Sequence, residues 1–352
     1  MTTHDTPSVL VVGGGYGGII VAKALDDAAD VTVVEPRDTF VHHVAALRAV
    51  VDPDWVERIF LPYDRLLTRG RFVRDRAERI DGTRVRLASG ATLTGNHVVV
   101  ATGSGYPYPA KLDIPDGVTA KARLRATHAE LTAADRVLLL GAGPVGLEFA
   151  GEIAAAWPTK QVTVADPSPV LLPGGYPDEF RAEVHRQLDE LGVRLLLGTR
   201  VPQPPTAPGQ AGGFSVAGID ADIWFRCHGT QPRTALPVDA HLRVRGVPGQ
   251  WAVGDVTDVP ELKMARLAQA HGEVVAANIR ALLTGADLTV HEPSPDMLVL
   301  PLGPKGGAGY GPDFGVLGAA QTADIKGGDL FVGYYRDVLN LDPEGTPPGR
   351  AA

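Results

Sequence analysis

The chain has 352 residues and a formal net charge of −8. Because Lys and Arg neutralise nucleic-acid phosphates, this acidic balance argues against a nucleic-acid partner. The single cysteine, Cys227, excludes an internal disulfide, a redox-active cysteine pair and a cysteine-based zinc site, and we expect no metal centre. No apolar run approaches the roughly 20 residues of a membrane span. Residues 1–8 lack the features of a signal peptide, so we expect a cytoplasmic protein without a transmembrane segment.

The first predicted element is a βαβ unit at residues 8–35. Residues 8–12 are short, apolar and β-branched, as in a buried parallel strand. A Gly-x-Gly-x-x-Gly motif starts at Gly13 and opens a helix, and the second strand ends at Glu35. Such a turn lets a diphosphate approach the backbone, and the helix N-terminus supplies N–H groups to the phosphates. The acidic residue at the end of the second strand binds ribose hydroxyls.

A second βαβ unit begins at residue 137. Its first strand leads into Gly141, Gly143 and Gly146 with the same spacing, and its second strand ends at Asp166. One such motif can be a ligand-free turn, but a repeat of the whole unit predicts two dinucleotide sites. Two dinucleotides in one chain suggest a resident flavin and an exchangeable nicotinamide, between which a hydride passes.

Later segments extend this plan. One strand ends in Ala101-Thr102-Gly103 after the first unit, and another ends in His228-Gly229-Thr230 after the second. A third short strand runs into Gly254-Asp255, where a carboxylate can hold hydroxyl groups of a flavin cofactor. A helical pattern follows at residues 264–283.

The remaining segments are loops and a Gly-rich C-terminal region. Residues 202–213 predict a surface loop or a hairpin tip, and residues 342–352 predict a disordered tail. From about residue 293 we expect a small β-rich domain with short strands in LVLPL, FGVLGAA and DLFVGYY.

These motifs resemble those of flavoprotein reductases with two dinucleotide-binding domains, such as the glutathione-reductase-like enzymes. The resemblance rests on both glycine motifs and on VVVATGS, HGTQP and WAVGDVTD. The stretches FVHHVAALRAVV, ELKMARLAQAHGEVVAANI and GGDLFV are more similar to apoptosis-inducing-factor-like proteins of the ferroptosis suppressor type. The resemblance covers nearly the whole chain.

The resemblance implies an α/β fold with two Rossmann-like domains and a small β-rich C-terminal domain. It implies an FAD-binding domain at residues 1–115 and 236–290, split by an NAD(P)H-binding domain at 116–235, with the C-terminal domain at 291–352. Proteins of this kind pass electrons from NADH or NADPH through FAD to a quinone or another small acceptor. Because the chain has no cysteine pair, electrons must leave from the flavin directly. The quinone motif of type II NADH dehydrogenases is not intact at residues 265–270, so a soluble quinone or aromatic acceptor is as suitable as a lipid-phase quinone.

The motifs and the resemblance together assign the binding residues. For FAD these are Gly13, Gly15, Tyr16, Gly17, Gly18, Glu35, Pro36, Arg37, Arg48, Ala101, Thr102, Gly103, Gly254, Asp255, Lys263, Met264 and Ala265. For NAD(P)H they are Gly141, Gly143, Pro144, Val145, Gly146, Glu148, Asp166 and Gly229. The Asp166 carboxylate accepts from a ribose 2′-hydroxyl and repels a 2′-phosphate, which favours NADH over NADPH.

Two candidates for the redox step come from the first unit and from the segment after Gly254. By resemblance, His42 lies where the chain passes the flavin and would donate to it or relay a proton; the alternative is a packing histidine, and the neighbouring His43 is the weaker candidate. Lys263 would stabilise the anionic reduced ring, and the alternative is a solvated lysine.

Two further candidates are expected to form a pair between the domains. Glu148 lies on the first turn of the second unit's helix, where the resemblance brings it near the nicotinamide. Arg48 is its expected cationic partner. The alternative for Glu148 is a purely structural role, because an acidic residue stabilises a helix N-terminus.

Three functions compatible with this pattern differ in the electron acceptor. The first is an FAD-dependent NAD(P)H oxidoreductase with a quinone-like acceptor. The second is a reductase of a ferredoxin-type protein, which the net charge disfavours because ferredoxins are usually acidic. The third is an NADH-sensing flavoprotein with little turnover. A specialised biosynthetic role and the oligomeric state are left open by the sequence.

Overall fold

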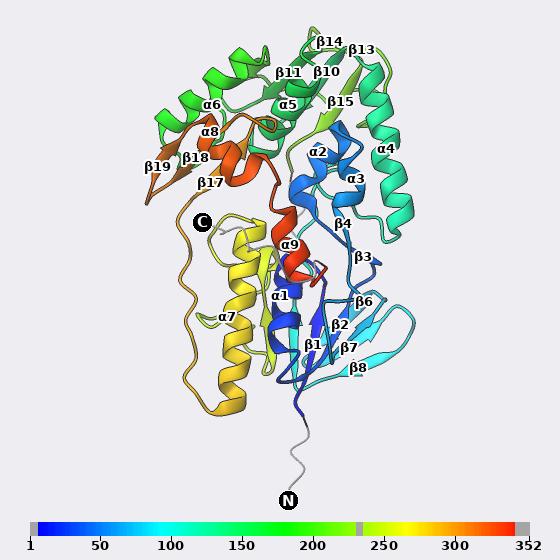
Figure 1. Cartoon of the computed structure of the whole chain (residues 1–352), viewed down its shortest axis with the longest axis vertical. Helices are drawn as coiled ribbons and strands as arrows, with labels where there is room; N and C mark the ends of the chain where they lie inside the picture. Colours follow the sequence, from blue (N-terminus) through cyan, green and yellow to red (C-terminus); the bar gives the residue numbers. More distant parts are fainter. Residues whose placement is uncertain (1–5, 230–234, 342–352) are drawn as a thin grey trace, which may run out of the picture.

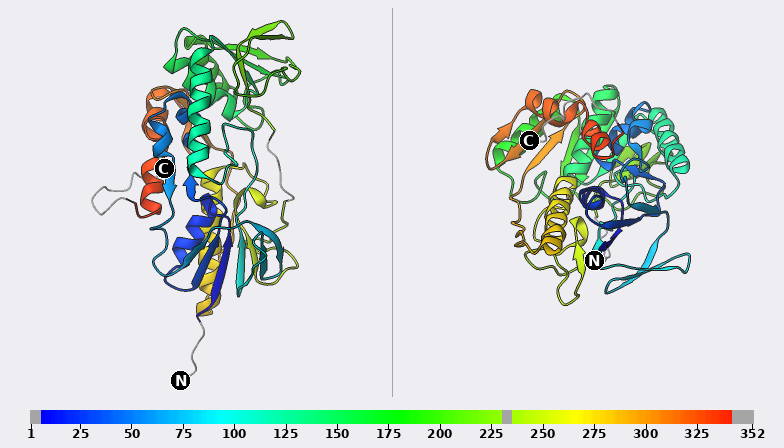
Figure 2. Two further views of the ribbon diagram at one scale, coloured as in Figure 1. Left: turned by 90° about the vertical axis from the view of Figure 1, so that its right-hand side faces the viewer. Right: turned by 60° about the horizontal axis from the view of Figure 1, so that its bottom comes forward.

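The computed structural model describes residues 6–229 and 235–341. Two parallel sheets with flanking helices lie one above the other in an elongated molecule, and the C-terminal segment runs beside both (Figures 1 and 2). This arrangement confirms the predicted α/β class with two Rossmann-like units. The predicted tail at residues 342–352 lies outside the described residues, as does Thr230.

The first unit is built on a five-stranded parallel sheet in the order β16-β9-β1-β2-β5. Its strands are β1 (Ser8–Val12), β2 (Asp30–Val34), β5 (Arg71–Val73), β9 (His97–Val100) and β16 (Gln250–Ala252). Residues 9–12 of the central strand β1 are all buried, which is why this strand is a continuous apolar run rather than an alternating one. Strand β16 follows the second unit in the chain, so the chain returns to the first sheet. The domain boundaries given above stay a prediction.

Helices α1 (Tyr16–Leu25) and α7 (Ala265–Thr284) pack against each other beside this sheet (Figure 1). Glycines make the close contact possible, because a Cβ added to Gly17 would lie 2.7 Å from the Ala268 oxygen. A Cβ added to Gly272 would likewise lie 2.7 Å from the Gly17 oxygen. The packing brings both helix N-termini to the carboxyl edge of the sheet, where ligands bind in open α/β sheets.

The second unit has a four-stranded parallel sheet in the order β12-β11-β10-β15. Its strands are β10 (Arg136–Leu140), β11 (Gln161–Asp166), β12 (Arg194–Leu197) and β15 (Ile223–Arg226), and its helices are α4 (Gly117–Ala133), α5 (Pro144–Ala156) and α6 (Asp178–Glu190). Residues 202–213 contain no helix or strand, as predicted, and lead into a hairpin of β13 (Phe214–Val216) and β14 (Ile219–Ala221).

Smaller elements surround the first unit. They are the paired strands β3 (Thr39–Val41) and β4 (Phe60–Pro62), an antiparallel sheet of β6 (Ala77–Asp81), β7 (Arg84–Leu87) and β8 (Thr92–Thr94), the short helices α2 (Ala46–Val51) and α3 (Trp55–Arg58), and 3-10 turns at His43–Ala45 and Gly254–Val256. Helix α2 is buried along its whole length and packs against α5, so it joins the two units. Within the described ranges, no helix is both long and apolar enough to cross a bilayer.

The C-terminal segment contacts both units. Strands β17 (Leu298–Pro301), β18 (Gly307–Gly311) and β19 (Gly315–Leu317) form an antiparallel sheet, followed by α8 (Ala319–Thr322), a π-helical turn (Ala323–Gly327) and α9 (Val332–Val338). The sheet lies against α6 of the second unit, and α9 lies beside α1 of the first (Figure 1).

The prediction of a strand in DLFVGYY is wrong, because this stretch leads into helix α9. Its buried residues Val332, Tyr335 and Val338 recur every three positions, which is helical rather than strand spacing. The Asp329 carboxylate accepts from the Gly333 N–H at 2.7 Å and so satisfies a donor of the first turn.

Candidate functional site

The two glycine turns are alike in their tightest contacts. Gly13 and Gly141 have φ angles of 109° and 122°, a region that side chains rarely adopt. A Cβ on Gly18 would lie 1.9 Å from the Gly13 oxygen, and a Cβ on Gly146 would lie 1.9 Å from the Gly141 oxygen. In both units, therefore, the third glycine lets the helix pack directly on the preceding turn.

The middle glycine of each motif faces open space. A Cβ added to Gly15 or to Gly143 meets no atom within 4 Å. Each of these glycines is the N-cap of its helix, α1 or α5, and neither helix has a side chain that caps it. Helix α7, with Met264 at its N-cap and Ala265 as its first residue, likewise has no side-chain cap. Uncapped N–H groups beside free space suit a phosphate.

The acidic strand-end residues are placed identically in both units. The Glu35 carboxylate accepts from the Gly14 N–H at 2.7 Å, and the Asp166 carboxylate accepts from the Ala142 N–H at 2.7 Å. Each also accepts from the N–H two positions further along the chain, that of Arg37 or of Ser168. The internal repeat therefore extends to individual hydrogen bonds.

The two carboxylates differ in their cationic neighbours. The Arg37 guanidinium pairs with Glu35 at 2.9 Å. Burial alone would raise the pKa of Glu35, but Arg37 and the backbone donors hold it below its ordinary value. Asp166 has no ion-pair partner among the described residues.

An open cleft lies beside the first glycine turn. Several predicted FAD residues line it together with residues that the sequence did not single out. The lining includes Gly13, Glu35, Pro36, Arg37, His43, Ala101, Thr102, Ser104 and Lys111. Gly103 follows with a φ angle of 63°.

The Gly254-Asp255 turn lies at the same edge of the sheet. Gly254 has a φ angle of 71°, and the Asp255 carboxylate accepts from the Ser104 hydroxyl at 2.6 Å and from the Lys111 amine at 3.1 Å. Lys111 therefore joins the cleft to this turn, and its amine also donates to the Ser104 carbonyl and hydroxyl oxygens at 3.1 and 3.0 Å. A lone lysine in a loop carries no sequence signal of this kind, which is why it was missed.

Lys263 is exposed, and its amine is held by its own loop. It donates to the carbonyl oxygens of Thr257 and Val259 at 3.0 and 3.2 Å. A role toward the flavin stays a prediction for this residue.

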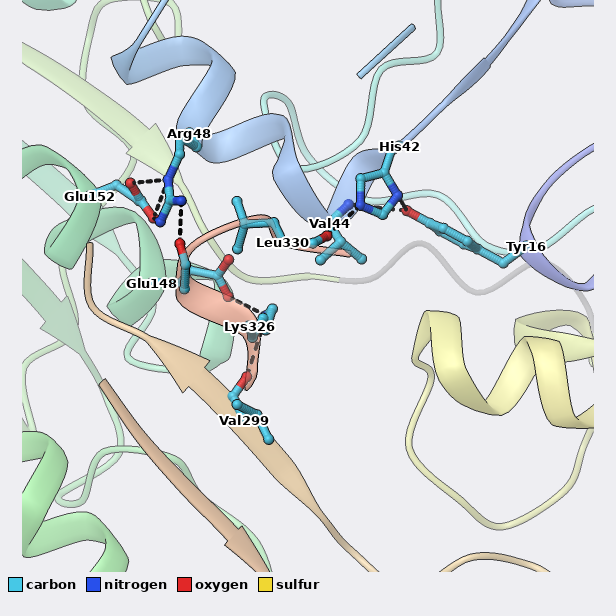
Figure 3. Close-up of polar contacts among 10 residues, drawn as sticks. Tyr16, His42, Val44, Arg48, Glu148, Glu152, Val299, Lys326 and Leu330 are labelled. Carbon is cyan, nitrogen blue, oxygen red and sulfur yellow. Dashed lines mark hydrogen bonds and ion pairs between the residues drawn. The ribbon is translucent and has the colours of Figure 1, made fainter. Parts of the chain in front are cut away.

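The predicted pair of Arg48 and Glu148 is wrong (Figure 3). Arg48 pairs with Glu152, one turn further along α5, at 2.6 Å, and it also donates to the Gly327 oxygen. Glu148 instead accepts from the Lys326 amine at 2.9 Å. The reason is geometric: Glu148 and Glu152 lie one turn apart on one face of α5, where α2 brings Arg48 to Glu152 and the C-terminal segment brings Lys326 to Glu148.

Lys326 is a candidate that sequence reasoning missed. It lies in the π-helical turn and also donates to the Val299 oxygen, and its side chain is 13% exposed. Turns of this kind are frequent at functional sites. The available signal was its place directly before the GGDLFV stretch, on which part of the family resemblance rests.

His42 is completely buried and is held at both ring nitrogens (Figure 3). Its Nδ1 lies 3.3 Å from the Tyr16 hydroxyl, which itself accepts from the Val44 N–H. The hydroxyl is therefore the donor to Nδ1, and Nε2–H donates to the Leu330 oxygen at 2.6 Å. Burial lowers the pKa of His42 to about 4, so the ring is neutral near pH 7. It anchors the C-terminal segment at Leu330, whose φ angle is 51°.

The remaining predicted nicotinamide residues surround the second turn. Pro144 and Val145 open α5, and Gly229 follows β15 with a φ angle of 87°. These positions fit the sequence-based assignment, which stays a prediction for each residue.

Comparison with known proteins identifies the family. Residues 7–272 match the pyridine nucleotide-disulphide oxidoreductase family. The chain belongs to this family. It is 30% identical to apoptosis-inducing factor homolog B of Dictyostelium discoideum, over 96% of this chain and 98% of that protein. It is also 30% identical to human ferroptosis suppressor protein 1, over 95% and 96% of the two chains.

A solved structure supports the fold. The sulfide:quinone oxidoreductase of Aquifex aeolicus superposes with a TM-score of 0.76, with 18% identity and coverage of 95% of this chain and 92% of that one. Membership of the family, rather than this fold likeness, makes the protein an FAD-dependent oxidoreductase with NAD(P)H as its co-substrate.

This family member cannot use the cysteine chemistry after which the family is named. Its single cysteine, Cys227, is buried at the end of β15, and burial raises the pKa of its thiol to about 12. The thiol therefore stays protonated and inert near neutral pH.

Proposed function

We propose that the protein is an NADH-dependent reductase of a quinone-like small acceptor. The observation that carries this proposal is the duplicated cradle, which consists of two glycine turns with matching hydrogen bonds and free space. The resemblance to ferroptosis-suppressor-type reductases supports a quinone as acceptor. The overall reaction is NADH + H⁺ + quinone → NAD⁺ + quinol.

The residues of the chain would bind and orient FAD and NADH and would supply charge at the site. FAD, when bound, accepts a hydride and passes the electrons on. The first glycine turn, Glu35, Lys111 and Asp255 would hold it, and the second turn with Asp166 would hold NADH. Lys326 donates from Nζ to Glu148 on α5, and its positive charge there favours a reaction that builds negative charge.

The direct test is an anaerobic titration followed by an acceptor panel. NADH should bleach the yellow protein, and a soluble quinone should restore the colour within turnover time. Fast turnover with a ferredoxin and slow turnover with quinones would replace this proposal by a protein-partner reductase. A long-lived reduced state with every acceptor would replace it by a sensor.

Lys326→Met is expected to slow anaerobic flavin reduction by NADH by about 100-fold, because a positive charge aimed at developing negative charge is worth this much in active sites. Lys326→Arg should recover most of the rate, since it keeps the charge. Stopped-flow absorbance measures the rate, and bound FAD per chain is the control. Equal rates for the Met variant and the parent protein would remove Lys326 from the redox step.

Asp166→Asn is expected to lower kcat/KM for NADH by about 10-fold, as is typical when one charged hydrogen bond to the ligand is weakened. The value for NADPH should fall less or rise, because the repulsion of a 2′-phosphate is removed. Steady-state assays with both nucleotides measure the ratio. Asp220→Asn on the exposed hairpin is the matched control. A ratio unchanged by Asp166→Asn would contradict the assignment.

A further inference from the structure

A cluster of one carboxylate and two imidazoles lies behind the Gly254 turn. Glu261 comes from the loop before α7, His271 from the second turn of α7, and His291 from the segment after α7. Their side chains are 1%, 2% and 6% exposed. None of the proposed redox chemistry uses these residues.

The hydrogen bonds of His271 define its protonation. Its Nδ1 accepts from the Gly254 N–H at 3.0 Å, so the proton of the neutral ring is on Nε2. Nε2–H donates to Glu261 Oε1 at 2.5 Å. A chain of hydrogen bonds thus runs from the flavin-side turn to Glu261.

Glu261 has no lysine or arginine partner among the described residues. Its Oε2 accepts from the Ser294 N–H at 3.1 Å, and the amine of Lys263 is engaged by carbonyl oxygens instead. A buried carboxylate is normally paired with a cation or bound to a metal. The structure therefore leaves a place for positive charge beside Glu261.

His291 lies beside Glu261, and its Nε2 atom has no hydrogen bond. Its Nε2 is buried, makes no hydrogen bond and lies 3.4 Å from Glu261 Oε2. One ring nitrogen of each histidine and a carboxylate oxygen lie within 4.8 Å of one another. Two imidazoles and one carboxylate are a donor set that Zn²⁺ accepts, with a fourth position for water.

The geometry points to a binding site for a divalent transition metal ion, such as Zn²⁺, formed by Glu261, His271 and His291. Zinc–nitrogen and zinc–oxygen bonds are about 2.0–2.2 Å long, so two atoms bound to one tetrahedral zinc ion lie about 3.3 Å apart. The 3.4 Å between His291 Nε2 and Glu261 Oε2 fits this spacing, whereas the 2.5 Å hydrogen bond between His271 and Glu261 has to open. This differs from the sequence-based expectation of no metal centre. That expectation rested on cysteine, whereas these ligands are distant in sequence and follow no motif.

Metal binding would act on the Gly254 turn through His271. Coordination requires a lone pair on Nε2, so the Nε2 proton is released and the neutral ring takes up a proton at Nδ1. Nδ1–H then faces the Gly254 N–H, and their hydrogen bond is lost. A metal ion at this site therefore loosens the turn that carries Asp255. By linkage, FAD and the metal weaken each other's binding by the same factor. This coupling rests on the proposed role of the Gly254-Asp255 turn, whereas metal binding itself does not.

The test is a titration of the metal-free, FAD-loaded protein with Zn²⁺ near neutral pH. Competition with a chromophoric zinc indicator measures binding, and the fluorescence of released FAD measures cofactor loss. We expect one Zn²⁺ per chain and FAD release several-fold faster at saturating Zn²⁺. His291→Ala should weaken Zn²⁺ binding by at least about 10-fold, as loss of one ligand does, and should abolish the effect on FAD. The variant leaves the Gly254–His271–Glu261 chain intact.

The matched control is His185→Ala, which removes an exposed histidine of α6 and should behave as the parent protein. Absence of stoichiometric Zn²⁺ binding, or equal binding by His291→Ala, would overturn the site and leave His291 as a neighbour of Glu261 without a metal. Stoichiometric binding with unchanged FAD release would overturn the coupling. Neither readout involves an electron acceptor, so failure here is distinguishable from failure of the proposed function.

Discussion

Replacing Gly15 by alanine is expected to leave the protein folded and to weaken FAD binding by about 10- to 100-fold. The added methyl group meets no protein atom within 4 Å, and Gly15 has φ and ψ angles of −79° and −168°, an extended conformation open to any residue. The methyl group would enter the space that a diphosphate needs beside the N-terminus of α1. Crowding by one methyl group costs about 1–3 kcal/mol, which is the stated change in affinity. The dissociation constant is measured by flavin fluorescence after removal of FAD.

The second unit supplies the matched variant. Gly143 has the same open surroundings, so Gly143→Ala should keep bound FAD and raise KM for NADH by about 10- to 100-fold. Gly18→Ala gives the contrasting case, because its Cβ would collide with the Gly13 oxygen and should destabilise the fold itself. If Gly15→Ala bound FAD normally while Gly143→Ala lost it, the assignment of the two cradles would be reversed. If both variants were unaffected, the turns would not bind dinucleotides.

The two units could be predicted because their signals are local. A short apolar strand, a glycine turn and a helix follow one another within about 20 residues, and each glycine has a steric reason that is independent of distant parts of the chain. The strand-end acids could be predicted for the same reason. The contacts of Glu35 with Gly14 and of Asp166 with Ala142 are consequences of that local plan.

Contacts between the two units could not be predicted from local sequence patterns. Glu148 and Glu152 are one turn apart on the same helix, and only the packing of α2 decides which of them meets Arg48. Lys326 reaches Glu148 from a distant part of the chain. Helix α9 was predicted as a strand because its apolar and aromatic residues also suit a strand, and three-residue spacing over seven residues is a weak signal.

The Arg48–Glu152 pair shows what such a contact contributes. Both side chains are at most 4% exposed, and the guanidinium donates to the carboxylate from Nε and Nη2 and to the Gly327 oxygen from Nη1. One side chain thus holds the first unit, the second unit and the C-terminal segment together. Arg48 was predicted to act in catalysis, but this geometry favours a structural role.

Glu152→Gln is therefore expected to destabilise the protein by roughly 3–5 kcal/mol, because it leaves a buried guanidinium without a counter-charge. The thermal unfolding midpoint of the FAD-loaded protein should fall by roughly 10 °C. Asp81→Asn is the control: its partner Arg79 lies 3.7 Å away, both side chains are at least 70% exposed, and such pairs contribute about 0–1 kcal/mol. The double variant Arg48→Met/Glu152→Leu should recover much of the loss, since an apolar pair leaves no buried charge. If Glu152→Gln had a normal thermal unfolding midpoint but slow flavin reduction by NADH, the Arg48–Glu152 pair would instead act in the redox step.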